Sequence, residues 1–514
     1  MTKHLLSFVL VCALFTKSFA QNVTILPSGI TPAPSGSYPR LNYDAILALP
    51  SPQTGDMAYD LTFLCLRVYN GSKWVCTYQS PNDSTPNSAA IATAGGTGGD
   101  VGRGIGVDAS GNIYVTGYFQ GTATFGTTSK TSAGSFDFFV AKYNSEGTFL
   151  WVQTAGGTGS DYANGIAVDA FGNVYVTGYF FGKASFGETS KTSAGDDDIF
   201  VAKYNSAGVL QWVQTAGGIN SDYSRGIVLD ASGNVYTTGS FEGTAAFGAT
   251  SKTSAGGTDI FVAKYNSEGI LLWVQTAGGT NNDYSRGIAI HTTGSIYITG
   301  YFAGTVTFGT TSKTSAGGFD IFVAKFDPVG LVWLWVQTAG GGPTSSDFAE
   351  DIAVDASGSA YITGNFQGTA TFGATSKTSE GSYDIFVAKY SSLGTFQWVQ
   401  TAGGTDEDDG QGIALDASGN VYVTGYFQQT ATFGATSKTT AGSNDIFVAK
   451  YSSAGALRWI QTVGGIFPDN GDDITIDANE NLHVTGSFSG TAAFGATSKT
   501  SVGQSDIFVA RFQQ

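Results

Sequence analysis

The chain has 514 residues, with 24 Lys and Arg against 40 Asp and Glu, and a formal net charge of −16 at pH 7. A surface this acidic repels phosphate backbones and anionic lipid, which argues against nucleic acid as a partner. After residue 20 no stretch approaches the roughly 18 uninterrupted apolar residues of a spanning helix, so we expect no membrane span.

Residues 1–20 have the composition of an export signal. A charged start leads into an apolar run over residues 5–15, and the small Ser18 and Ala20 precede the predicted cleavage site. We therefore expect a secreted protein, located in the periplasm, outside the cell or at the cell surface after cleavage near Ala20.

Residues 21–87 form a separate proline-rich segment, predicted to contain a small β-hairpin module. The Asn70-Gly71 pair predicts a tight turn that places Cys65 opposite Cys76. Export favours a disulfide between them, although this register gives a hydrogen-bonded pair, where cross-strand bridges fit less well. A catalytic cysteine is the less favoured interpretation.

The rest of the chain is a repeat. The marker "TAGG", or "TVGG" in the last case, begins seven copies spaced 61 to 63 residues apart, numbered here 1 to 7, at Thr93, Thr154, Thr215, Thr276, Thr338, Thr401 and Thr462. Such a period predicts units that each bury their faces against the next unit.

Each copy is predicted to form four strands. In copy 2 the strands are "NGIAVD", "NVYVTGYF", "DIFVAKYN" and "LQWVQT", joined by Gly-, Ser- and Asp-rich connectors. The second and third strands are apolar on both faces, so their sheets should lie between like neighbours. Gly165 and Ala167 in the first strand suit a crowded innermost position.

Copy 7 stops at "DIFVARFQQ" and lacks the fourth strand. In a ring, the other end of the repeats can supply that strand. Residues 88–96, "SAAIATAGG", align without a gap to "FLWVQTAGG"; the rival donor is "SKWVCTY". We therefore predict an all-β fold, in which residues 88–514 form a seven-bladed β-propeller of four-stranded antiparallel blades, closed by an N-terminal strand.

The segment "GGTGSDYANGIAVDAFGNVYVTGYF" resembles the SBBP-type β-propeller repeat of bacterial secreted and surface proteins, and the resemblance recurs over residues 93–514. It implies the propeller fold and no particular chemistry. The segment "LPSPQTGDMAYDLTFLCLRVYNGSKWV" resembles small β-modules near the head of bacterial surface and tail-fibre proteins.

Aspartates recur at fixed places in the copies. One series stands at the turn between the first two strands, where Asp favours a type I turn: Asp108, Asp169, Asp230, Asp355, Asp416 and Asp477, with His291 in copy 4. Another opens the third strand: Asp137, Asp198, Asp259, Asp320, Asp384, Asp445 and Asp506.

A further series lies in the connector before each first strand: Asp100, Asp161, Asp222, Asp283, Asp347, Asp408 and Asp469. Propeller topology puts this connector and the start of the third strand on one face, which would be strongly negative. Calcium takes six to eight oxygens, so this series could supply calcium ligands. The alternative is that each Asp fixes its own loop by accepting backbone N–H groups.

One position differs between copies. Ten residues after each marker threonine, allowing for a two-residue insertion in copy 5, stand Arg103, Asn164, Arg225, Arg286, Glu350, Gln411 and Asp472. The next residue is glycine, except for Asp351 and Asp473. These nine residues should line the rim of the central channel. Such asymmetry predicts a discriminating binding site, and drift on a solvated loop is the equal alternative.

Enzyme signatures are mostly absent, since only His291 and His483 remain after residue 20. We expect an exported non-enzymatic binding protein, a monomer, that contacts a protein or glycan ligand through the Asp-rich face and the rim. It should require no cofactor, with calcium as an option. One alternative is a secreted polysaccharide hydrolase or lyase that uses carboxylates on that face. The other is a structural envelope component.

Overall fold

The computed structural model describes residues 86–513 and, before them, residues 25–26, 29–30, 40–41, 45–46, 48–49, 57–60, 65–69, 72 and 74–79. The predicted export signal, residues 1–20, lies outside the described residues. The chain divides into two compact units, Met1–Asn82 and Asp83–Gln514, and each is described by itself.

The first unit contains a small sheet. β3 (Arg40–Leu41), β4 (Met57–Asp60), β5 (Cys65–Tyr69) and β6 (Trp74–Gln79) pair in that order, and β1 (Ile25–Leu26) pairs with β2 (Gly29–Ile30). The buried Ile46, Ala58 and Trp74 pack together in this unit.

The predicted register of its hairpin is wrong. Tyr69 pairs with Trp74 and Arg67 with Cys76, and a bulge between Leu66 and Arg67 then places Cys65 opposite Gln79. Because Tyr69 pairs with Trp74 and not with Ser72, every later pair of the hairpin is shifted from the predicted register. The side chains of both cysteines lie outside the described residues, so the disulfide stays a prediction.

The second unit repeats one antiparallel pattern. The first strands of the copies are β8 (Val101–Val107), β14 (Asp161–Val168), β18 (Tyr223–Leu229), β22 (Asp283–Ile290), β26 (Phe348–Val354), β30 (Asp409–Leu415) and β36 (Asp469–Ile476). The fourth strands are β13 (Phe149–Gly157), β17 (Leu210–Gly217), β21 (Leu271–Gly279), β25 (Val332–Gly340), β29 (Phe396–Gly403) and β35 (Leu457–Gly465).

The second and third strands run on into a hairpin at the outer end of each sheet. In copies 2 to 5 they are β15 (Val174–Phe186) and β16 (Thr189–Tyr204), β19 (Val235–Phe247) and β20 (Thr250–Tyr265), β23 (Ile296–Phe308) and β24 (Thr311–Asp327), and β27 (Ala360–Phe372) and β28 (Thr375–Tyr390).

In copies 1, 6 and 7 the same path is divided into shorter strands. These are β9 (Ile113–Phe119), β10 (Thr122–Phe125), β11 (Thr128–Thr131) and β12 (Asp137–Tyr143); β31 (Val421–Phe427), β32 (Thr430–Phe433), β33 (Thr436–Thr439) and β34 (Asp445–Tyr451); and β37 (Leu482–Phe488), β38 (Thr491–Phe494), β39 (Thr497–Thr500) and β40 (Asp506–Gln513).

This outer hairpin replaces one of the connectors expected from the sequence. In copy 2 its turn contains Gly187 at a φ of 62°, and Ala184 and Phe186 point inward with no exposed surface. The hairpin also pairs with the preceding copy, because Ala184 lies opposite Gly157 in β13. The "TAGG" marker is therefore the place where consecutive sheets join.

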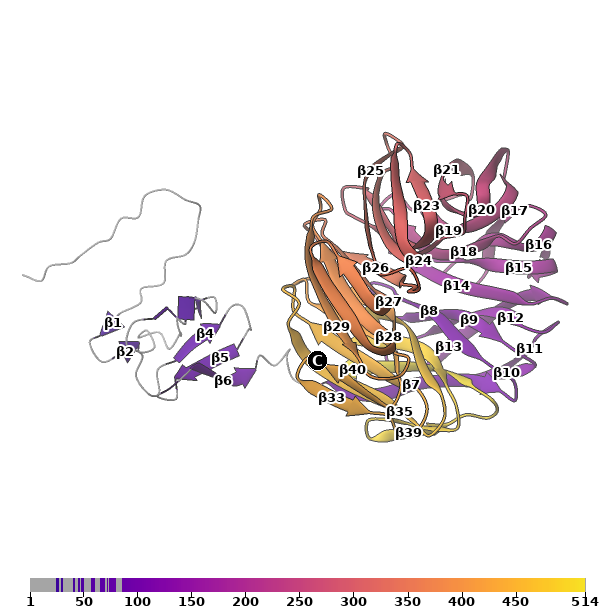
Figure 1. Cartoon of the computed structure of the whole chain (residues 1–514). Helices are drawn as coiled ribbons and strands as arrows, with labels where there is room; N and C mark the ends of the chain where they lie inside the picture. The colour runs from indigo at the N-terminus through magenta and orange to yellow at the C-terminus, as the bar shows by residue number, and fades with distance from the viewer. Residues whose placement is uncertain are drawn as a thin grey trace, which may run out of the picture. The chain divides into compact units, whose positions relative to one another are not determined.

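Strands from opposite ends of the second unit lie side by side. β7 (Asn87–Gly96) pairs antiparallel with β40, with Thr93 opposite Phe508, and it also pairs with β10. Figure 1 shows yellow β40 next to indigo β7. This is the pairing that the alignment of residues 88–96 predicts, whereas the rival donor, residues 72–78, pairs with β5.

The sheets of neighbouring copies pack face to face, as the doubly apolar strands predict. Val174, Tyr175 and Val176 point to alternate faces of β15, and all are at most 1% exposed. Phe138 of copy 1 stacks on Phe200 of copy 2 with ring centroids 4.5 Å apart. Burial of both faces removes enough apolar surface from water to stabilise sheets that could not stand alone.

Candidate functional site

A β-bulge near the start of each first strand positions the residues that differ between copies. In β14 the pairing shifts between Ala163 and Gly165, so Asn164 has no partner on β15. The other bulged residues are Arg103, Arg225, Arg286, Glu350, Gln411 and Asp472. Since a bulge releases its extra residue from the ladder, this position tolerates any side chain.

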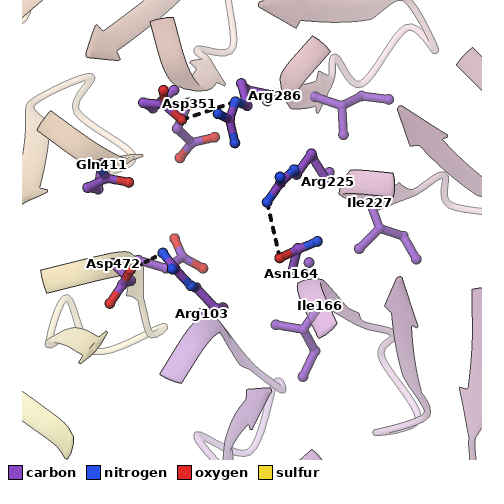
Figure 2. A pocket seen from close by; sticks show the side chains of 15 residues that line it. Arg103, Asn164, Ile166, Arg225, Ile227, Arg286, Asp351, Gln411 and Asp472 are labelled. Carbon is purple, nitrogen blue, oxygen red and sulfur yellow. Dashed lines mark hydrogen bonds and ion pairs between the residues drawn. The ribbon is translucent and has the colours of Figure 1, made fainter. Parts of the chain in front are cut away.

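All nine residues predicted at the rim line a single cavity of about 180 Å³ (Figure 2). The rest of its wall is Gly165, Ile166, Gly226, Ile227, Gly287 and Ile288, from the first strands of copies 2, 3 and 4. We call this space the rim cavity. Its side chains are polar or charged except for the three isoleucines.

Arg103 is held by a carboxylate across the rim cavity. Its Nη1 donates to Asp472 Oδ1 at 2.6 Å, and its guanidinium lies 5.7 Å from the ring centroid of Tyr118. The attraction of Asp472 raises the pKa of Arg103. Burial raises the pKa of Asp472 to about 6 even with Arg103 beside it.

Arg286 is also paired. Its Nη2 donates to the Tyr301 hydroxyl at 2.7 Å, and its Nε lies 3.5 Å from Glu350 Oε2. Burial alone would lower the pKa of Arg286, but the charge of Glu350 and the contact with Tyr301 outweigh it, so the pKa is raised. Two of the three rim arginines are thus neutralised by acids of other copies.

Arg225 differs from the other two. Its Nη1 donates to Asn164 Oδ1 at 3.4 Å, and Asn164 in turn donates to the carbonyl of Ser224 at 2.9 Å. Within the described residues, no carboxylate lies within 4.0 Å of its guanidinium. Burial and the charge of Arg286 lower the pKa of Arg225 to about 10. In Figure 2 it extends toward the open middle of the rim cavity.

Asp351 binds backbone amides of two copies. Its Oδ1 accepts from the N–H of Ile352 at 2.8 Å, and its Oδ2 accepts from Ile413 of copy 6 at 3.0 Å. Burial raises its pKa to about 7. The structure therefore gives this predicted ligand-binding residue a role in joining two inner strands.

Asp473 does the same at the junction of copies 7 and 1. It accepts from Ile474 at 2.7 Å and from Ile105 at 2.8 Å. Burial, and then the charge of Asp351, raise its pKa well above the ordinary value. The two aspartates are therefore close enough to influence each other across the rim.

Copy 6 contributes a neutral side chain with an acidic partner. Gln411 Nε2 donates to Asp409 Oδ2 at 2.5 Å, and Asp409, the last residue of "DEDD", is 6% exposed. Burial, followed by the charge of Glu350, raises the pKa of Asp409 well above its usual range.

The first-strand amides and the tyrosine rings beside the arginines were missed as parts of the site. Tyr118, Tyr179 and Tyr301 follow the repeat, and their rings pack against neighbouring aromatics. Their second contact, with the arginines, depends on the bulge, and no pattern in the sequence marks the bulge.

The predicted calcium ligands, which we call the junction aspartates, lie away from the rim cavity. They are Asp100, Asp161, Asp222, Asp283, Asp347, Asp408 and Asp469, all with 0% exposure. Asp222 Oδ2 accepts from Gly218 N at 2.7 Å and its Oδ1 from Glu242 N at 3.0 Å. Both oxygens are engaged in the same way in Asp100, Asp408 and Asp469.

Four of the seven junction aspartates thus have an amide N–H on each carboxylate oxygen. Within the described residues, one oxygen each of Asp161 and Asp347 and both oxygens of Asp283 have no hydrogen-bond partner, so calcium binding stays a prediction. The described part of the chain contains no group of three or more His, Cys, Asp or Glu side chains arranged to hold a metal. The alternative, in which the aspartate fixes the backbone around it, accounts for the two amide contacts of Asp222.

The aspartates of the first-to-second-strand turns also have a structural role. Asp108 Oδ1 accepts from the amides of Ser110 and Asn112, each at 2.9 Å, and its carbonyl accepts from Gly111 N at 2.9 Å. The turn interpretation is confirmed.

Comparison with known proteins agrees with this fold. Residues 150–179 and 397–426 match the family model described as a β-propeller repeat, SBBP. The chain is a β-propeller repeat protein.

Relatives of this propeller are distant. An uncharacterized WD repeat-containing protein of Acanthamoeba polyphaga mimivirus is 26% identical over 482 residues, which covers 74% of this chain and 34% of that protein. The regulatory protein FlaEY of Caulobacter vibrioides is 25% identical over 427 residues, covering 74% of this chain and 43% of that protein. The chain thus spans less than half the length of both relatives.

Solved structures also resemble this propeller. The WD40 propeller domain of Doa1 aligns with a TM-score of 0.41 and 12% identity, covering 83% of this chain and 97% of that one. In the described part of the propeller chain, no helix is long and apolar enough to cross a membrane.

Proposed function

We propose that this propeller is an exported, non-enzymatic binding protein whose ligand, a protein or a glycan, places a polar group in the rim cavity. One observation carries the proposal. The nine residues that depart from the repeat at two adjacent positions line the same cavity and bring arginines, acids and amides together there.

We further propose that the copies form a ring of seven four-stranded blades. The support is the pairing of β7 with β40, in which a strand before copy 1 takes the place of the fourth strand that copy 7 lacks. The rim cavity adds to it, since its lining comes from all seven copies.

The hydrolase or lyase alternative is less favoured. Such an enzyme needs a carboxyl group that is free to exchange a proton with the substrate. Asp351 and Asp473 do not meet this need, because both oxygens of each accept backbone amides. Within the described residues this leaves Asp409 and Asp472, each with one buried oxygen without a hydrogen-bond partner, as its rim candidates. A structural envelope component would make no use of the rim cavity, and the following experiment separates it from a binder.

The full chain is tested against a glycan array and in pull-downs from envelope proteins. The rim variant combines Arg103→Gln, Arg225→Gln and Arg286→Gln. The control combines Lys183→Gln, Lys252→Gln and Lys313→Gln, which removes the same charge from the outer hairpins. Binding that the rim variant loses and the control keeps supports the proposal. Binding unchanged in the rim variant, or no specific binding by the full chain, contradicts it.

A further inference from the structure

The chain itself shows what the inner strands bind at the level of the rim cavity. In copies 5 and 7 the residue after the bulge is an aspartate, and each carboxylate bridges the amides of two adjacent copies. Asp351 joins Ile352 to Ile413, and Asp473 repeats this between copies 7 and 1. The amides of copies 5, 6, 7 and 1 are thus bound by carboxylates that the chain supplies.

The equivalent amides of copies 2, 3 and 4 face the same cavity. In copy 2, Asp169 N donates to Asn173 O, so residues an even number of positions before Asp169 bond within the ladder. Ile166 lies three positions before it, so its N–H points away from β15. Ile227 and Ile288 hold the same places in copies 3 and 4, and all three residues line the rim cavity.

No carboxylate of the chain follows the bulge in these three copies. The position that Asp351 and Asp473 occupy elsewhere is taken by Gly165, Gly226 and Gly287. These glycines also line the rim cavity, and they place no side chain of their own between the cavity and the three amides.

Arg225 stands on this side of the cavity and is the rim arginine that has no carboxylate of the described residues within 4.0 Å. Its guanidinium donates one hydrogen bond there, to Asn164 Oδ1 at 3.4 Å, and lies 5.7 Å and 5.9 Å from the ring centroids of Tyr179 and Tyr223. A guanidinium in a confined site gains most from a carboxylate, because two charge-assisted bonds can form at once. Copies 2 to 4 therefore combine a cation with three inner-strand amides beside which the chain places glycine instead of aspartate.

We infer that the rim cavity binds a carboxylate group of an external ligand, held by Arg225 and by the inner-strand amides of copies 2 to 4 in the way that Asp351 and Asp473 are held by theirs. This inference rests on the proposed function and names the chemistry of the ligand. The cavity of about 180 Å³ holds roughly six water volumes. That space fits a small free organic acid or one acidic sugar at the end of a glycan.

The test titrates the full chain with sodium acetate and with D-glucuronic acid by isothermal titration calorimetry in low-chloride buffer. D-glucose, acetamide and sodium sulfate are the matched controls. Binding of acetate and glucuronate at similar strength indicates a free acid, and much tighter glucuronate binding indicates an acidic sugar. No saturable binding of either probe, or equal binding of sulfate or glucose, overturns the inference.

Two variants locate the site. Arg225→Gln is expected to weaken carboxylate binding by about 10- to 100-fold, the loss typical of a charged hydrogen bond, and Lys183→Gln should leave it unchanged. Gly226→Asp supplies the missing carboxylate from the chain and should block the site. The substitution is made at Gly226 and not at Gly165 because the nearest atom to an added Cβ is easier to displace there. At Gly226 it is a side-chain carbon of Ile288, at 2.7 Å, whereas at Gly165 it is the backbone oxygen of Arg225, at the same distance. A thermal melt confirms that each variant is folded.

If Arg225→Gln binds acetate as well as the unaltered chain, the inference is wrong. Its failure is distinguishable from failure of the proposed function. A glycan or protein that binds in a rim-dependent manner but is not displaced by acetate or glucuronate leaves the binding function standing and removes only the carboxylate assignment.

Discussion

The junction aspartates and the rim residues both recur once per copy, yet one set is uniform and the other varies. Asp222 accepts one backbone amide on each carboxylate oxygen, and Asp100, Asp408 and Asp469 do the same in their copies. Asn164 and Arg225 occupy bulges, where the ladder imposes no requirement. The comparison teaches that repetition in this chain marks the scaffold, while departure from repetition marks the surface free for binding.

A rise in pH should deprotonate the junction aspartates of all copies and lower the stability of the fold. We expect this to be the largest effect. Burial raises their pKa values to between about 6, for Asp100, and about 8, for Asp283, above the roughly 3.9 of an unfolded chain. The folded state then keeps protons that the unfolded state releases. Stability present near pH 4 is therefore lost as pH rises through 6 to 8.

Thermal melts between pH 5 and 8.5 measure this effect, and the melting temperature should fall as pH rises. Asp283→Asn removes one titrating carboxyl, so the melting temperature of this variant should fall less steeply with pH. A melting temperature that rises across this range contradicts the assignment.

Removal of one junction carboxylate should be the next largest effect. Asp222→Ala leaves the amides of Gly218 and Glu242 buried without an acceptor, at a cost of about 2–4 kcal/mol in the free energy of unfolding. Urea unfolding followed by tryptophan fluorescence measures it. Asp222→Asn, which retains one acceptor oxygen, should lose less, and an Ala variant as stable as the unaltered chain would show that the cap is dispensable.

Conversion of an aspartate clamp to glycine should have a smaller effect and sharpen the comparison within the rim. Asp473→Gly gives copy 7 the pattern of copies 1 to 4 and releases the amides of Ile474 and Ile105. We expect a loss of about 1 kcal/mol, because water in the cavity can replace the carboxylate. The variant should also bind acetate more strongly, as measured by isothermal titration calorimetry. An unchanged acetate affinity would show that the amides released by this substitution do not bind the anion.

The smallest change in stability is expected at Asn164. Asn164→Ala removes the bonds to Ser224 and Arg225 from a partly exposed bulge, so the free energy of unfolding should change by no more than about 0.5 kcal/mol. A loss as large as that of Asp222→Ala would mean that the rim is part of the scaffold.

Much of this architecture was accessible from the sequence because the strands are short, doubly apolar and repeated. Val174 and Tyr175 predict burial on opposite faces without any knowledge of the partner, and residues 88–96 align with a known strand. The outer hairpin was missed although "KASFGETSKT" alternates around a glycine, because its polar residues resembled a connector. The alternation of Ala184 and Phe186 was the available signal.

The sequence identified the residues that line the rim cavity, but it did not show which of them contact each other. The alignment placed Asp351 and Asp473 beside the arginines as equals. Which arginine each acid neutralises, and that both aspartates bind amides instead, depends on distances across the rim between residues far apart in the chain. No local pattern carries that information.

The outer hairpins have a consequence for how such a chain changes in length. The outer hairpin of each copy pairs with the fourth strand of the preceding copy, as Ala184 of β15 pairs with Gly157 of β13. A duplicated unit would therefore find matching hydrogen-bond partners on either flank wherever it was inserted. Because this pairing is the same at every junction, it does not limit the number of copies. The limit comes from how closely the inner strands can approach one another, which depends on small residues such as Gly226.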